Sequence, residues 1–198
     1  MTDGRIFFEG NPWPEGHPIS EFRWVAERRG QDVWFGFHLE TEDYNSERKP
    51  EDYESVEYLS DWHAPGVWGN FHRCRISSDY WHEGGYAVCP ADQFTAGRID
   101  GMVVRVDPLP QDLEAEYDER AFHIYLLGHD AVADHKIAFA RIEGTDLFDI
   151  TWEGKIALAY VGDYEPKYRF KAIIQGARLP DIGNGGSAEM TASGRKRS

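Results

Sequence analysis

Two histidines and two aspartates lie close together in the sequence, as His129-Asp130 and Asp134-His135, with three small apolar residues between the pairs. Imidazole nitrogens and carboxylate oxygens are common ligands of divalent metals, and two histidines with one carboxylate form a recognised metal-binding pattern. A metal ion held in this way can activate water for hydrolysis. The segment is therefore a candidate metal site made of His129, His135, Asp130 and Asp134.

The residues that flank this segment predict a hairpin around residues 131–133. Residues 120–128 and 135–142 are rich in β-forming residues, and directly opposed residues of a hairpin have Cβ atoms about 5 Å apart, which would bring the two histidines together. Neighbouring strand residues point to opposite faces, however, and opposed aspartates repel each other when no cation is present. The alternative is a hairpin end at which the aspartates cap backbone N–H groups. We expect no cofactor, and a divalent metal is the alternative.

A second cluster combines aromatic rings with histidines between residues 62 and 83. Trp and Tyr offer a flat apolar face and a polar edge, which suits stacking on a sugar or anchoring a protein partner. The alternative is burial in the core, but Trp81 and His82 are adjacent and precede Gly84-Gly85, so strand alternation cannot bury both. The candidate partner-binding residues are Trp62, His63, Trp68, His72, Trp81, His82 and Glu83.

Negative charge is concentrated in two segments. Residues 40–61 contain nine acidic and two basic residues, a net charge of −7, and residues 107–119 contain six acidic and no basic residues. Together they account for −13 of the formal net charge of −14, so the rest of the chain is nearly neutral. This distribution argues against nucleic-acid binding, which needs clustered Lys and Arg, and indicates either solvated loops or surfaces that attract a basic protein.

The elements that position these residues are predicted to be β-strands. Alternation of apolar and polar residues recurs in short runs separated by Gly, Pro and Asp, and amphipathic helical spacing is nearly absent. Arg29-Gly30 and Glu153-Gly154 each predict a tight turn. The sequence therefore predicts an all-β protein, an antiparallel β-sandwich or jelly roll with little helix, in a single domain over residues 1–179 that carries the acidic loop 40–61. Residues 180–198 are small, polar and Gly-rich, which predicts a disordered tail.

The remaining features limit the location of the protein and its redox state. No run approaches the roughly 18 apolar residues of a membrane span, and the first residues lack a secretory signal, so we expect a cytoplasmic protein with no membrane partner. In a reducing compartment, Cys74 and Cys89 are expected to be two thiols. Homo-oligomer formation is left open.

Three functions fit these observations. The first is a non-catalytic binding protein, in which acidic loops and an aromatic rim engage a basic partner. The second is a metal-dependent hydrolase that uses the His/Asp cluster, and the third is a carbohydrate-binding module that uses Trp62, Trp68 and Trp81. The common catalytic signatures, such as the nucleophile elbow, the P-loop and HExxH, are absent from the sequence, so we favour the first function.

Overall fold

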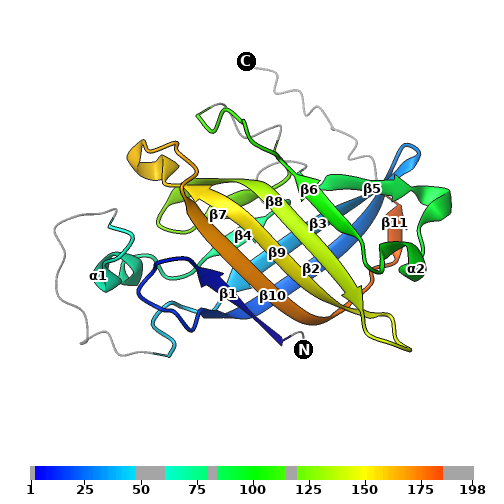
Figure 1. The fold of residues 1–198 in the computed structure, drawn as a ribbon, viewed down its shortest axis with the longest axis horizontal. Helices are drawn as coiled ribbons and strands as arrows, with labels where there is room; N and C mark the ends of the chain where they lie inside the picture. The colour runs from blue at the N-terminus through cyan, green and yellow to red at the C-terminus, as the bar shows by residue number, and fades with distance from the viewer. Residues whose placement is uncertain (1–2, 48–60, 80–83, 115–119, 185–198) are drawn as a thin grey trace, which may run out of the picture.

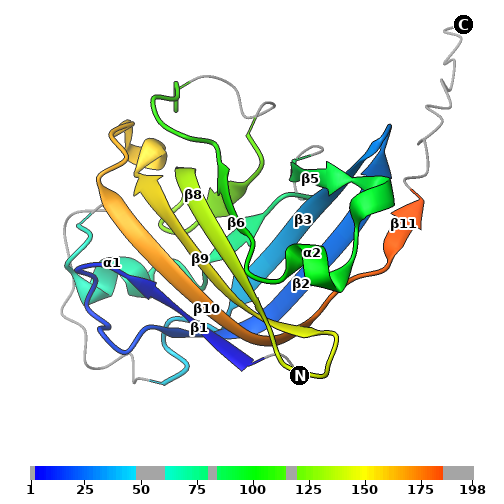
Figure 2. The ribbon, with the colours of Figure 1, turned by 45° about the vertical axis from the view of Figure 1, so that its right-hand side comes forward.

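The structure is a computed structural model that describes residues 3–47, 61–79, 84–114 and 120–184, and it consists mostly of antiparallel β-structure (Figures 1 and 2). The strands in these residues are β1 (Asp3–Phe8), β2 (His17–Arg29), β3 (Asp32–Thr41), β4 (Arg75–Ser77), β5 (Tyr86–Pro90), β6 (Val103–Val106), β7 (His123–Tyr125), β8 (His129–Arg141), β9 (Leu147–Ala157), β10 (Tyr168–Arg178) and β11 (Ile182–Asn184). The short helices are α1 (Pro65–Gly69), η2 (Ala91–Gln93), α2 (Ala96–Ile99) and η4 (Ala159–Val161).

Eight of these strands close into a barrel. Their order is β2-β1-β10-β9-β8-β7-β4-β3, and β3 pairs again with β2. Closure depends on β2, which pairs with β1 through His17 and Pro18 and with β3 along most of its remaining length. The prediction of an all-β antiparallel fold is confirmed, but the prediction of a sandwich or jelly roll is wrong. Inward and outward residues alternate in the same way in both architectures, and the barrel is distinguished by the pairings that complete its ring, such as the long-range pairing of β1 with β10.

Aromatic side chains fill the barrel interior. On β9, the buried residues Phe148, Ile150 and Trp152 alternate with residues that face outward. The ring centroid of Trp152 lies 4.6 Å from that of Phe122 and 5.4 Å from that of Phe37. An eight-stranded barrel has an interior just wide enough for side chains to fill, which makes its wall a rigid scaffold for residues on the outer face.

Strand β8 runs without interruption through the segment predicted to be a hairpin turn, so that prediction is wrong. The turn lies earlier, where Leu126 N donates to the carbonyl of Gly128 (3.0 Å) before β8 returns along β7. Gly128 has a φ of +130°, which favours glycine, whereas Ala131, Val132 and Ala133 are buried and pair with β9. The first part of β8 pairs with β7 and its last part pairs with β6.

The other two predicted turns have different outcomes. The turn at Gly30 is confirmed, because β2 and β3 form a hairpin with Arg29 opposite Asp32, and Gly30 has a φ of +64°. The prediction of a turn at Glu153-Gly154 is wrong, because β9 continues through both residues. Gly154 instead faces the packed interior, where an added Cβ would lie 2.5 Å from Phe170 Cε1.

The segments predicted as loop and tail are described only in part. Residues 40 and 41 end β3, and residues 48–60 and 115–119 of the acidic segments lie outside the described residues. Within the predicted tail, β11 pairs in parallel with β2, with Ile182 opposite Ala26, and residues 185–198 are not described. Cys74 and Cys89 are buried free thiols, as expected.

Candidate functional site

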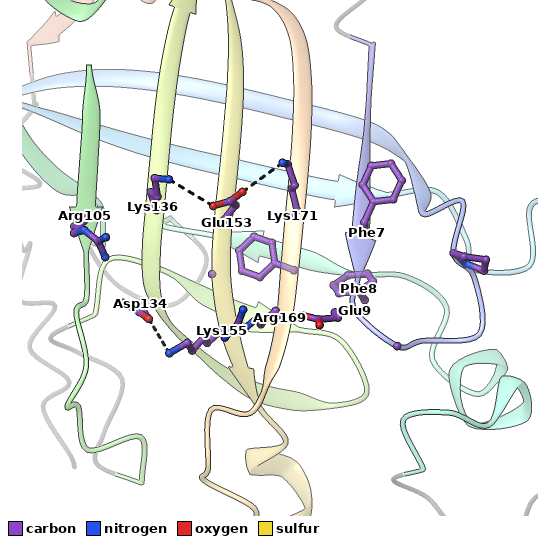
Figure 3. A pocket seen from close by; sticks show the side chains of 14 residues that line it. Phe7, Phe8, Glu9, Arg105, Asp134, Lys136, Glu153, Lys155, Arg169 and Lys171 are labelled. Carbon is purple, nitrogen blue, oxygen red and sulfur yellow. Dashed lines mark ion pairs between the residues drawn. The ribbon is translucent and has the colours of Figure 1, made fainter. Parts of the chain in front are cut away.

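A basic groove crosses the outer face of the barrel, over β6, β8, β9, β10 and β1 (Figure 3). Its volume is about 650 Å³, which is within the range of roughly 300–1,000 Å³ typical of small-molecule sites. Outward side chains of neighbouring strands line it, so the strand register determines which residues meet.

One transverse row of the groove follows directly from this register. Arg105 on β6 is opposite Lys136 on β8, Lys136 is opposite Glu153 on β9, Glu153 is opposite Lys171 on β10, and Lys171 is opposite Phe7 on β1. Both lysines share the carboxylate of Glu153, with Nζ–O distances of 4.0 Å for Lys136 and 3.4 Å for Lys171. Figure 3 shows this row across the three central strands.

A second row lies two residues further along the strands. Lys155 on β9 is opposite Arg169 on β10, and Lys155 Nζ forms an ion pair with Asp134 Oδ2 at 3.0 Å. Asp134 and His135 together face the single residue Gly154, which makes this part of β8 a β-bulge, and Asp134 has a φ of +53°. In this bulge, the carboxylate of Asp134 lies on the outer face beside Lys155, while the ring of His135 is buried.

The groove carries a net positive charge in an acidic protein. Among the described residues, five cationic side chains line it, against three carboxylates, those of Glu9, Asp134 and Glu153. The three lysines form ion pairs with Asp134 or Glu153. Within the described part of the chain, the exposed guanidinium groups of Arg105 and Arg169 have no ion-pair partner. Both guanidinium groups are therefore available to an anionic ligand, and Arg binds carboxylate or phosphate in a bidentate manner.

The sequence signal for this groove was present but incomplete. In residues 167–171, Arg169 and Lys171 alternate with Tyr168 and Phe170, which places both cations on one face of a strand. Nothing in the sequence shows that this strand lies beside Glu153 and Lys155, because the pairing of β9 with β10 is tertiary information.

The four predicted metal ligands lie on one strand and do not converge. His129 is exposed near Tyr125, with ring centroids 5.4 Å apart, while Asp130 and His135 are each 1% exposed. Among the described residues, no group of three or more His, Cys, Asp or Glu side chains is arranged to hold a metal ion. Metal binding at these residues therefore gains no support from their geometry.

His135 and Asp107 form a polar pair in the barrel wall. Trp152 Nε1 donates to His135 Nδ1 (3.1 Å), so in the neutral ring the proton resides on Nε2, which lies 4.0 Å from Asp107 Oδ2. Burial lowers the pKa of His135 to about 3 and raises the pKa of Asp107. The imidazole is therefore neutral and enclosed, which suits a structural role.

Asp130 caps the turn before β8 and the loop after β9. Its Oδ2 accepts from Leu127 N (3.0 Å) and its Oδ1 accepts from Tyr160 N (3.4 Å). Burial raises the pKa of Asp130 to about 6. Asp130 therefore caps backbone N–H groups, as the alternative interpretation predicts, but in a buried position after the turn at Gly128 and not at a hairpin end around residues 131–133. Asp134 forms an ion pair with Lys155.

The predicted aromatic rim is mostly structural where it is described. Trp62 and Trp68 are 1% and 0% exposed, and Trp68 Nε1 donates to the carbonyl of Trp62 (2.8 Å). Trp62 Nε1 and His63 Nδ1 donate to the carbonyls of Glu9 (2.9 Å) and Gly10 (2.7 Å), so they fix the rim of the groove. His72 is exposed beside Asp43, at 3.4 Å. Trp81, His82 and Glu83 lie outside the described residues.

Comparisons of the chain with protein-family models, with curated proteins and with solved structures gave no match. In the described part of the chain, no helix is both long enough and apolar enough to cross a membrane.

Proposed function

We propose that this protein is a non-catalytic binding protein that holds an anionic ligand in the basic groove. The observation that carries the proposal is the convergence of five cationic side chains, from four neighbouring strands, on one groove of about 650 Å³. The chain as a whole has a net charge of −14, so this concentration of positive charge contrasts with the rest of the molecule.

The chemistry of the lining favours binding over catalysis. The described residues that line the groove include no His, Cys, Ser or Thr, which are the usual nucleophiles and general bases. The carboxylates of Asp134 and Glu153 are held by lysines. Because the lining side chains project from paired strands of a closed barrel, they form a pre-organised surface that loses little entropy on binding.

The basic partner predicted from the acidic segments stays a prediction. Residues 48–60 and 115–119 of those segments lie outside the described part of the chain, and no surface made of the described residues is assigned to such a partner. The groove is a separate surface, and its charge has the opposite sign.

The proposal is tested by titrating the protein with inorganic tripolyphosphate in a calorimeter, using Arg169→Gln as the groove variant. A hydrogen-bonded charge pair contributes about 1.5–3 kcal/mol, so we expect Arg169→Gln to weaken binding by about tenfold. Arg178→Gln is the matched control, because Arg178 is an exposed cation on the same strand but outside the groove. Absence of binding to the wild-type protein, or an equal loss in both variants, would overturn the proposal.

A further inference from the structure

The groove is chemically asymmetric along its length. Cations dominate over β6, β8, β9 and β10, whereas the β1 end is lined by Phe7, Phe8, Gly10 and Pro14 together with one carboxylate, that of Glu9. Phe7 is directly opposite Lys171 in the strand register, so an apolar ring adjoins the cationic row (Figure 3). A ligand that fills the whole groove therefore meets mostly cations at one end and, at the other, a surface that is apolar apart from Glu9.

The apolar end is fixed before any ligand arrives. The ring of Phe7 packs closely against Gly16. An added Cβ at Gly16 would lie only 2.7 Å from Phe7 Cδ1. Arg5 holds the same loop by donating to the carbonyls of Glu15 and Gly16, each at 2.9 Å. Together with the hydrogen bonds from Trp62 and His63 to residues 9 and 10, these contacts fix both ends of the loop that contributes Pro14.

The cationic part of the groove is too wide for a single small anion. Arg105 on β6 and Arg169 on β10 are separated by three inter-strand steps, and neighbouring strands are about 4.8 Å apart, which gives about 14 Å across the sheet. Lys136 and Lys155 lie on the two strands between these guanidinium groups, and Lys171 lies beside Arg169 on β10. A chain of several anionic groups engages this array better than one phosphate does.

Resting on the proposed function, we propose that the ligand belongs to the nucleoside polyphosphate class, with an aromatic ring against Phe7 and Pro14 and its phosphates over Lys171, Arg169 and Lys136. A base that stacks on an aromatic side chain gains about 1–3 kcal/mol, and this gain does not depend strongly on the identity of the base. The phosphates form charge-assisted hydrogen bonds with the Arg and Lys side chains. The groove volume accommodates a ligand of this size.

The test compares ATP, tripolyphosphate and adenosine as calorimetric probes, all without added divalent metal. We expect ATP to bind about tenfold more tightly than tripolyphosphate, and adenosine to bind much more weakly than either. In Phe7→Leu, which keeps an apolar side chain against Gly16 but removes the ring, the advantage of ATP over tripolyphosphate should fall below about threefold while tripolyphosphate affinity is unchanged. Phe71→Leu, at a residue outside the groove that packs near Tyr160, is the matched control and should keep the full advantage of ATP.

The outcomes separate the two proposals. Equal binding of ATP and tripolyphosphate, or an advantage of ATP that survives in Phe7→Leu, would overturn the nucleotide inference and leave the anion groove standing. Failure of both ATP and tripolyphosphate to bind would overturn both proposals.

Discussion

His135 and Asp130, two buried residues of β8, respond to acid in opposite directions. Burial lowers the pKa of His135 from 6.5 to about 3, so the folded protein keeps a ring neutral that the unfolded chain would protonate. Between about pH 6.5 and 3 the unfolded chain binds a proton at this residue that the folded protein does not bind. The free energy of unfolding therefore has its full value, as far as His135 is concerned, above about pH 6.5, and it decreases as the pH falls toward 3. Burial raises the pKa of Asp130 from 3.8 to about 6, so the folded state takes up a proton first and gains stability as the pH falls from 6 to 4.

His135→Asn should reduce the acid sensitivity of the protein. The Asn Oδ1 atom can occupy the position of Nδ1 and accept from Trp152 Nε1, but it does not titrate. We expect the drop in the free energy of unfolding between about pH 6.5 and 4 to be smaller by roughly 3 kcal/mol than in the wild-type protein. Urea unfolding followed by far-ultraviolet circular dichroism at both pH values measures this drop, and an unchanged drop would contradict the account.

Asp130→Asn should have the opposite effect on the same measurement. The variant loses the carboxylate that takes up a proton in the folded state, so its free energy of unfolding should fall more steeply with acid, by roughly 2 kcal/mol over the same range. A shallower fall in this variant would show that Asp130 does not carry a raised pKa.

The sequence identified the chemistry of these residues but not their arrangement. The one-residue alternation of strands correctly separates His129 from Asp130, and it predicts that the four residues cannot all converge. The bulge at Asp134 and His135 could not be predicted, because it depends on the packing of His135 against Gly154 of the neighbouring strand. The burial of Trp62 and Trp68 also depends on contacts with distant residues, such as the stacking of Trp62 on Tyr168 at 4.1 Å.

At the scale of elements, the contact between the β8 bulge and β9 couples packing in the barrel interior to the position of the groove residues on the outer face. Gly154 lets the side chains of Phe170 and His135 approach the β9 backbone, while its neighbours Glu153 and Lys155 line the groove on the opposite face. A side chain at position 154 would press on the interior and displace the strand that carries both groove residues.

Gly154→Ala should therefore destabilise the protein. The added Cβ would lie 2.5 Å from Phe170 Cε1 and 2.9 Å from His135 Nδ1, both in fully packed side chains, so we expect a loss of about 1–3 kcal/mol in the free energy of unfolding. Gly97→Ala is the control, because Gly97 lies in α2 with open space around its added Cβ. That variant should be neutral or more stable by up to about 1 kcal/mol. Urea midpoints of the two variants decide the matter, and equal midpoints would contradict the packing argument.

The sequence predicted the strands better than it predicted their partners. In residues 167–175 apolar and polar residues alternate, and this pattern matches the buried and exposed faces of β10; Gly30 correctly marks the β2–β3 hairpin. Gly154 could not be interpreted from the sequence, since glycine serves equally in a turn and at a close approach of side chains to a strand. The choice between sandwich and barrel depends on the pairing of β1 with β10, near opposite ends of the chain, for which the local pattern carries no signal.

At the scale of the whole molecule, charge is segregated between the groove and the acidic segments. The five groove cations belong to the part of the chain that is nearly neutral overall, and two segments carry −13 of the −14 net charge. The Debye length is about 8 Å at physiological ionic strength, so charges that lie farther than this from the groove are largely screened from a ligand in it.

Binding of tripolyphosphate should therefore weaken as salt is added. Between about 20 and 200 mM NaCl we expect its affinity to fall several-fold, because contacts with the exposed groove cations are screened. Calorimetric titrations at four salt concentrations measure the slope. An affinity that rises with salt would mean that repulsion by the acidic segments outweighs attraction by the groove.

The most direct test of the central claim, that the outer face of β8–β10 is an anion-binding groove, is to map the binding site by nuclear magnetic resonance. ¹⁵N-labelled protein is titrated with tripolyphosphate, and the backbone amide shifts are followed residue by residue. The account predicts saturable shifts concentrated at residues such as Arg105, Lys136, Lys155, Arg169 and Lys171. Shifts that are absent, or that concentrate away from these strands, would contradict it.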